Sequence, residues 1–179
     1  MKPTKKRRKK LVRFRNGRAP MVGGPSSLTF VVLGEPQGKG RPIGTTSKTG
    51  TIRMVTPRKT RHYETRIAQT AELAVVRAGW GWAPGDRFLL LLTIRRIHED
   101  RGPDADNIVK AVADACNDVA WTDDRHLRWG WWSVELVTPG EEPHIEVKIY
   151  KVTAAQSRKI LESFVETVMG CTQEIRKNG

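Results

Sequence analysis

The most apolar stretch of the chain, residues 87–97, reads RFLLLLTIRRI. A continuous apolar run of this length predicts a central, buried β-strand, because a strand with one solvated face alternates apolar and polar residues. It is far shorter than the roughly 18 apolar residues of a membrane-spanning helix, and the chain contains no such run. The sequence therefore predicts a globular protein built around this strand, with no membrane span.

Further elements are expected on both sides of this strand. Apolar periodicity predicts helices over 60–79, with Thr60 and Gly79 as caps, over 106–119, with Asp106 as N-cap, and over 153–169. Strands are expected over 28–33, 127–137 and 144–151, and residues 34–58 are expected to form one long loop. This order predicts an α+β fold, a small mixed sheet of about four strands with helices packed on it.

Charge is unevenly distributed along the 179 residues. The chain has 32 Lys and Arg against 19 Asp and Glu, a net charge of +13, and ten of the bases fall in residues 1–18, which contain no acid. We interpret 1–27 as a flexible basic arm, 28–151 as the folded domain and 152–179 as a C-terminal helix and tail. A second basic concentration lies within the domain at 39–66. Both favour a polyanionic partner, although a solubilising or targeting role for the arm is the simpler alternative.

The cysteines and tryptophans suggest structural roles. Cys116 and Cys171 have no zinc-site spacing and imply no disulfide framework, which fits a reducing, cytoplasmic setting. The chain has six tryptophans. For the three on the predicted strand 127–137, Trp129, Trp131 and Trp132, sheet packing or a dimer interface is favoured over stacking on unpaired bases.

The segment 101–114, RGPDADNIVKAVAD, is rich in carboxylates. At 100° per residue, Asp106, Lys110 and Asp114 share one helix face, opposite the apolar face. A capping role would account for Asp106 but not for Asp104 as well. Lys110 can serve a phosphate or form an ion pair with Asp114.

A second acidic pair, Asp123-Asp124, follows the predicted helix. Hard divalent cations prefer oxygen ligands, so Asp104, Asp106 and one of this pair would form a suitable set. An ordinary turn is the alternative for the pair. A helix of 13 residues is about 20 Å long, so the two acidic groups meet only if the chain doubles back or if two subunits share the site. The sequence leaves both arrangements open.

These residues resemble a known family. The pattern D-x-D-N-x-x-K at 104–110, followed by Trp121-Thr122-Asp123-Asp124, is similar to that of the RusA Holliday junction resolvases, phage-type DNA endonucleases. The segments 34–42 and 56–64 also resemble the N-terminal region of that family. The likeness covers about residues 28–151 and leaves out the basic arm and the C-terminal segment.

The resemblance implies a homodimeric, Mg²⁺-dependent endonuclease, with Mn²⁺ as an alternative ion, that resolves four-way DNA junctions by paired symmetric nicks in the host cytoplasm. It implies catalytic roles for Asp104, Asp106, Asp124 and Lys110, with the three aspartates as metal ligands and Asp123 as a neighbouring ligand.

Basic residues must bring DNA to such an acidic site, since carboxylates repel phosphates. Two other functions remain open: a non-catalytic nucleic-acid-binding protein, and a nuclease of the same chemistry that acts on flaps or forks. The candidates for DNA contact are Lys39, Arg41, Arg58, Lys59, Arg61, Arg95, Arg96 and Arg101.

Overall fold

The computed structural model describes residues 24–46, 49–83, 85–98, 101–153, 155–156 and 159. Most of the arm predicted over 1–27, and most of the predicted C-terminal segment with its helix over 153–169, lie outside these residues. Cys171 also lies outside them. No helix in the described part of the chain is long and apolar enough to cross a membrane.

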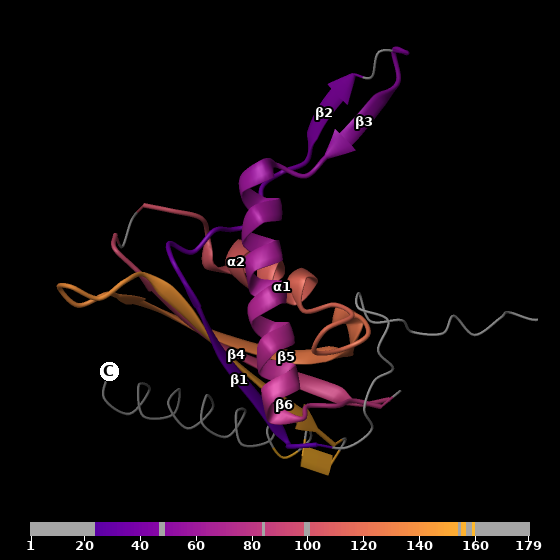
Figure 1. Ribbon diagram of the computed structural model, residues 1–179, viewed down its shortest axis with the longest axis vertical. Helices are drawn as coiled ribbons and strands as arrows, with labels where there is room; N and C mark the ends of the chain where they lie inside the picture. The colour runs from indigo at the N-terminus through magenta and orange to yellow at the C-terminus, as the bar shows by residue number, and fades with distance from the viewer. Residues whose placement is uncertain are drawn as a thin grey trace, which may run out of the picture.

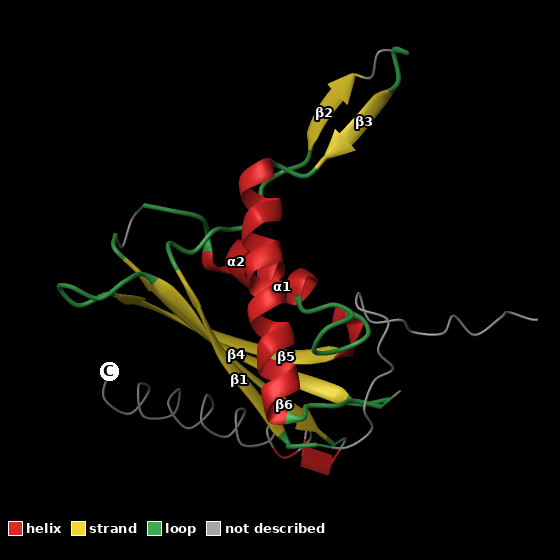
Figure 2. Ribbon diagram, in the orientation of Figure 1, coloured by secondary structure: helices red, strands yellow, loops and turns green. Residues whose placement is uncertain are grey.

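A four-stranded mixed sheet forms the body of the protein and confirms the predicted α+β class (Figure 2). The strand order is β1-β6-β4-β5, so β4 is an inner strand, as predicted. β6 runs antiparallel to both β1 and β4, whereas β4 and β5 are parallel. The strands are β1 (Ser27–Leu33), β4 (Arg87–Arg96), β5 (Leu127–Leu136) and β6 (His144–Val152).

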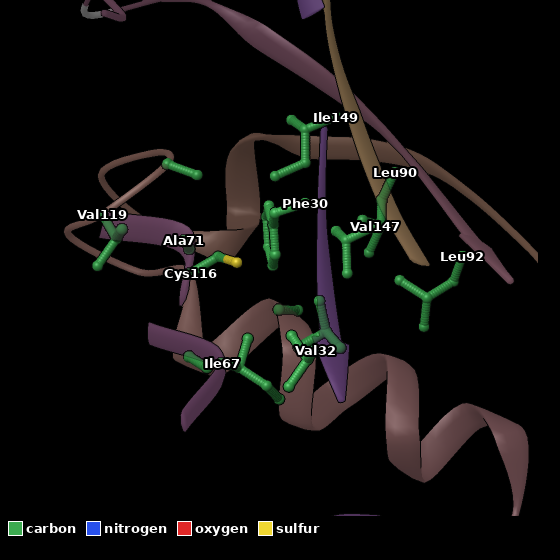
Figure 3. Packing of buried hydrophobic residues seen from close by; sticks show 14 of the residues in the cluster. Phe30, Val32, Ile67, Ala71, Leu90, Leu92, Cys116, Val119, Val147 and Ile149 are labelled. Atoms are coloured by element: carbon green, nitrogen blue, oxygen red, sulfur yellow. The ribbon is translucent and has the colours of Figure 1, made fainter. Parts of the chain in front are cut away.

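One face of the sheet forms the hydrophobic core. Alternate residues of β4, from Phe88 to Ile94, are buried, and their neighbours on the other face are only half-buried. The continuous apolar run thus marks an inner strand, as predicted, although its second face is only partly covered. Helices α1 (Arg58–Ala78) and α2 (Ala105–Ala115) contribute Ile67, Ala71 and Val112 to the core, as does Cys116 directly after α2 (Figure 3).

Both helices begin two residues or less from the predicted positions, but with different caps. α1 begins after Pro57, so Thr60 lies inside its first turn rather than at its N-cap. Gly79 ends α1 as predicted, with a φ of 61° that favours glycine. The N-cap of α2 is Asp104 and not Asp106. α2 ends at Ala115, before the predicted Val119, because residues 116–121 form a turn.

The segment 34–58 is not one long loop. It contains a second, two-stranded antiparallel sheet formed by β2 (Ile43–Thr46) and β3 (Ile52–Val55). This hairpin extends away from the body beyond the N-terminal end of α1 (Figure 1). The segment forms strands because Ile43, Ile52 and Val55 favour extended backbone, and Gly50, with a φ of 78°, permits the turn.

The root of the hairpin, residues 36–42, is held against both helices. The backbone N–H of Lys39 donates to the carbonyl of Asn107 at 2.9 Å, and that of Gly40 donates to the Thr60 hydroxyl at 3.0 Å. Gly38 lies so close to α2 that a Cβ atom there would be 2.6 Å from the Cβ of Pro103. The root and the starts of α1 and α2 therefore form one packed unit.

The close approach at Gly38 allows the packing of the hairpin root on α2 to be tested. A Gly38→Ala substitution should push the root away from α2 and destabilise the fold by about 1–3 kcal/mol, as overpacking does. Hydrogen exchange of the Lys39 amide should accelerate. Gly44→Ala is the matched control, because its nearest heavy atoms would be 3.8 Å away, an ordinary contact. Unchanged protection of Lys39 in Gly38→Ala would contradict this packing.

Candidate active site

The start of α2 presents two exposed carboxylates, Asp104 and Asp106. Asp104 is the N-cap residue, but its side chain makes no capping hydrogen bond. Asp106 lies in the first turn and is not the cap, so the capping interpretation fails for its side chain. The helix start is fixed instead by the fully buried Ile108 and by the bond from Lys39 to Asn107. Both carboxylates are therefore available to a ligand.

Lys110 lies one turn after Asp106 and contacts it directly. Its Nζ donates to Oδ2 of Asp106 at 2.9 Å. This hydrogen bond lowers the pKa of Asp106 below its ordinary value, so the carboxylate is ionised at neutral pH. The alternative partner, Asp114, forms an ion pair with Lys39 instead. Lys110 is therefore placed as the spacing of 104–110 suggests, with its ammonium beside the acidic helix start.

The second acidic pair divides into two different roles. The Asp123 carboxylate accepts a hydrogen bond from the backbone N–H of Arg125 at 3.0 Å and caps the 3₁₀ turn Asp124–His126. That bond lowers the pKa of Asp123. The contacts of Asp123 are thus those of an ordinary turn residue, the alternative considered for this pair. Asp124 is exposed.

The connection β4–α2–β5 determines how the two acidic groups lie. Because β4 and β5 are parallel, α2 returns the chain from the end of β4 to its beginning, where Leu127 pairs with Phe88. Asp104 and Asp106 therefore lie at one end of α2 and Asp124 beyond the other. The 11 residues of α2 span about 16 Å. Within the described ranges, no three His, Cys, Asp or Glu side chains are grouped closely enough to hold a metal ion.

Exposed basic residues lie on the two segments that pack beside the start of α2, the hairpin root and the first turn of α1. The root of the hairpin carries the exposed Arg41, and the first turn of α1 carries exposed bases as well. Contacts of Gly40 with Pro57 and Thr60 hold these two segments together. The exposed bases of this group are Arg41, Arg58, Lys59 and Arg61.

The other three arginines predicted to contact DNA differ in their surroundings. Arg95 approaches three carboxylates, those of Glu135, Glu141 and Glu146, with the shortest N–O distance 2.9 Å. Its charge is already balanced within the sheet, which makes it the weakest candidate for a phosphate contact. Arg96 is half-buried, whereas Arg101 is exposed close to the start of α2.

Two exposed apolar surfaces were not predicted from the sequence as surfaces. One is the β2–β3 hairpin. The other is β5, an edge strand whose Trp131, Trp132 and Leu136 are exposed, while Trp80, Trp82 and Trp121 are buried in the core. Gly50, between two β-branched threonines, could have indicated the turn of the hairpin. Of the tryptophans on β5, Trp129 is half-buried, whereas Trp131 and Trp132 are exposed.

Comparison with known proteins identifies the fold and the chemistry. Residues 34–150, more than half of the chain, match the family model described as endodeoxyribonuclease RusA. No curated protein matches the chain. The matched range includes the hairpin, both helices and every aspartate discussed above. The enzymes of this family are Holliday junction-resolving endonucleases that generally depend on a divalent metal. The chain belongs to the RusA family of endodeoxyribonucleases.

Proposed function

We propose that this protein is a Mg²⁺-dependent resolvase that cuts four-way DNA junctions by paired symmetric nicks, as a homodimer in the cytoplasm. The observation that carries this proposal is the exposed pair Asp104 and Asp106, with Lys110 on Asp106 at 2.9 Å, beside a cluster of exposed bases. Carboxylate oxygens suit Mg²⁺, and Mn²⁺ can replace it in such a set. Family membership argues against the non-catalytic alternative.

The chemistry follows from these groups. A bound divalent ion lowers the pKa of a water and stabilises charge on the phosphoryl oxygens. Asp104 and Asp106 would supply ligand oxygens from one subunit. The Lys110 ammonium would lie beside the scissile phosphate, where it can stabilise developing negative charge or protonate the leaving oxygen.

Positioning of the DNA backbone would fall to the exposed bases around the site. Arg41, Arg58 and Lys59 are exposed on the segments that pack beside the acidic helix start, so they can hold phosphates near the one that is cut. Lys39 would act differently, since its ion pair with Asp114 fixes the hairpin root against α2. Within one subunit Asp124 lies beyond the opposite end of α2 from Asp104 and Asp106, so it is too distant to join them.

A symmetric dimer formed through β5 would overcome the separation of Asp124 from Asp104 and Asp106. β5 is a ten-residue edge strand that exposes Trp131 by 60% and Leu136 by 51%. A long, apolar, unprotected edge is characteristic of a strand that pairs with another chain. In a two-fold dimer with the two β5 strands side by side, these strands run antiparallel. The start of the partner's β5 would then face the end of β5.

This arrangement would complete the acidic set. Asp124 directly precedes β5, and the end of β5 lies beside the end of β4, where Leu136 pairs with Arg96. The chain then leads from β4 to Asp104. Asp124 of the partner subunit would thus approach Asp104 and Asp106, twice in each dimer. Two symmetric sites are what paired nicks on a two-fold junction require.

The first prediction of this proposal concerns Asp104. Asp104→Asn should lower junction cutting by about 10²-fold or more, because a metal ligand is lost. Binding of the junction should persist or tighten, since a negative charge is removed. The unfolding free energy should change by less than about 0.5 kcal/mol, because the Asp104 side chain makes no capping bond. Cutting is measured with labelled four-way junction, flap, fork and duplex DNA, with and without Mg²⁺.

Glu142→Gln, at an exposed carboxylate after β5, is the matched control for loss of one charge and should cut like the unmodified protein. If Asp104→Asn cut at the normal rate, the metal-site assignment would be wrong. Faster cutting of flaps or forks than of junctions by the unmodified protein would favour the alternative substrate.

The second prediction concerns the dimer. Val134→Lys, at an exposed position of β5, should leave the protomer folded but yield monomers in analytical ultracentrifugation, because it places a charge in the proposed interface. Cutting should be lost together with dimerisation. Leu73→Lys, at an exposed position of α1, is the control and should remain dimeric. A fully active monomeric Val134→Lys protein would refute the shared site.

A further inference from the structure

The β2–β3 hairpin is a folded element without a hydrophobic core of its own. All residues of β2 and all but one of β3 are exposed. An isolated two-stranded ribbon is at best marginally stable in water, so such a ribbon gains most from a partner that covers it. Two of its apolar side chains are largely exposed: Ile52 by 72% and Met54 by 66%.

These two side chains share one face of the ribbon. In the antiparallel register Met54 pairs with Gly44 and Ile52 with Thr46, and directly paired residues project from the same face. Gly44 adds no side chain between them. Ile52 and Met54 therefore form a narrow apolar ridge, while Ile43 and Arg53 lie on the opposite face.

The segment that bears the ridge carries only positively charged side chains besides its neutral ones. Residues 36–63 contain seven Lys and Arg and no Asp or Glu. A second copy of this basic ribbon would be repelled, whereas a polyanion would be attracted. The charge therefore selects a nucleic acid as the partner of the hairpin over a like-charged protein surface.

The root of the hairpin ties this ridge to the proposed active site. Gly38 packs on Pro103, and Lys39 hydrogen-bonds Asn107, within three residues of both Asp104 and Asp106. Each strand has four residues, and a rise of roughly 3.3 Å per residue makes the ribbon about 13 Å long. That length reaches the base edges, because the grooves of B-DNA are about 7.5–8.5 Å deep.

We infer that the β2–β3 hairpin inserts Ile52 and Met54 between bases at the branch point and unstacks them while the active site engages the backbone. Isoleucine and methionine are among the side chains that enter base steps in proteins that kink DNA. Unstacking costs least where bases are already poorly stacked, as at a branch, so insertion favours junctions over duplex. This inference rests on the proposed DNA substrate but not on cutting.

The test uses the full-length protein and a four-way junction with 2-aminopurine at the branch point, in EDTA so that no cutting occurs. Binding of the unmodified protein should raise the fluorescence, because the base loses its stacking. Ile52→Ser/Met54→Ser should lose most of that rise and show about a five- to tenfold smaller preference for junction over duplex. Affinity for duplex should change less than about twofold, because the bases that contact phosphate remain.

Leu73→Ser/Val76→Ser, at two exposed apolar residues of α1, is the matched control and should behave like the unmodified protein. Circular dichroism should show that both double variants are folded. A protein that cuts junctions without a fluorescence rise would overturn the insertion and leave the resolvase proposal intact. A fluorescence rise without Mg²⁺-dependent cutting would support the insertion and overturn the resolvase proposal. A hairpin variant that changes sedimentation and not fluorescence would identify the ridge as a protein contact.

Discussion

The parallel pairing of β4 with β5 is the constraint on which the rest of the structure depends. It forces α2 to run back along the sheet, and so it separates Asp104 and Asp106 from Asp124 by the length of a helix. The strand order places β5 at the edge of the sheet, with Trp131 and its neighbours exposed. The sheet topology thus separates the carboxylates and also exposes the strand through which the proposed dimer would bring them together.

The other end of the site is organised by contacts of the hairpin root with the starts of both helices. Gly38 and Gly40 allow the hairpin root to pack on the starts of α2 and α1, where Lys39 bonds Asn107 and Thr60 accepts from Gly40. This unit holds the exposed bases, the carboxylates and the hairpin in one place. Cutting and recognition would therefore be coupled through a rigid root, with no large movement needed to bring them together.

The sequence predicted the elements with strong periodicity well. The run Phe88–Ile94 marked an inner strand, and the pattern at 104–110 marked Asp106 and Lys110 as neighbours, because side chains four apart meet on a helix. It missed the hairpin, since a ribbon with no buried face has no hydrophobic alternation strong enough to separate it from a loop. It could not place Asp124, because the position of Asp124 relative to Asp104 depends on the strand order and, in the proposed dimer, on a second subunit.

The shared site is tested most directly by mixing subunits. Asp104→Asn and Asp124→Asn proteins are each expected to be inactive; a mixed dimer, isolated by two different affinity tags, would contain one site with both aspartates intact. The mixed dimer is expected to regain Mg²⁺-dependent nicking of the four-way junction, one strand at a time, because it has one intact site where the unmodified dimer has two. A mixed dimer as inactive as its parents would contradict a site built from two subunits.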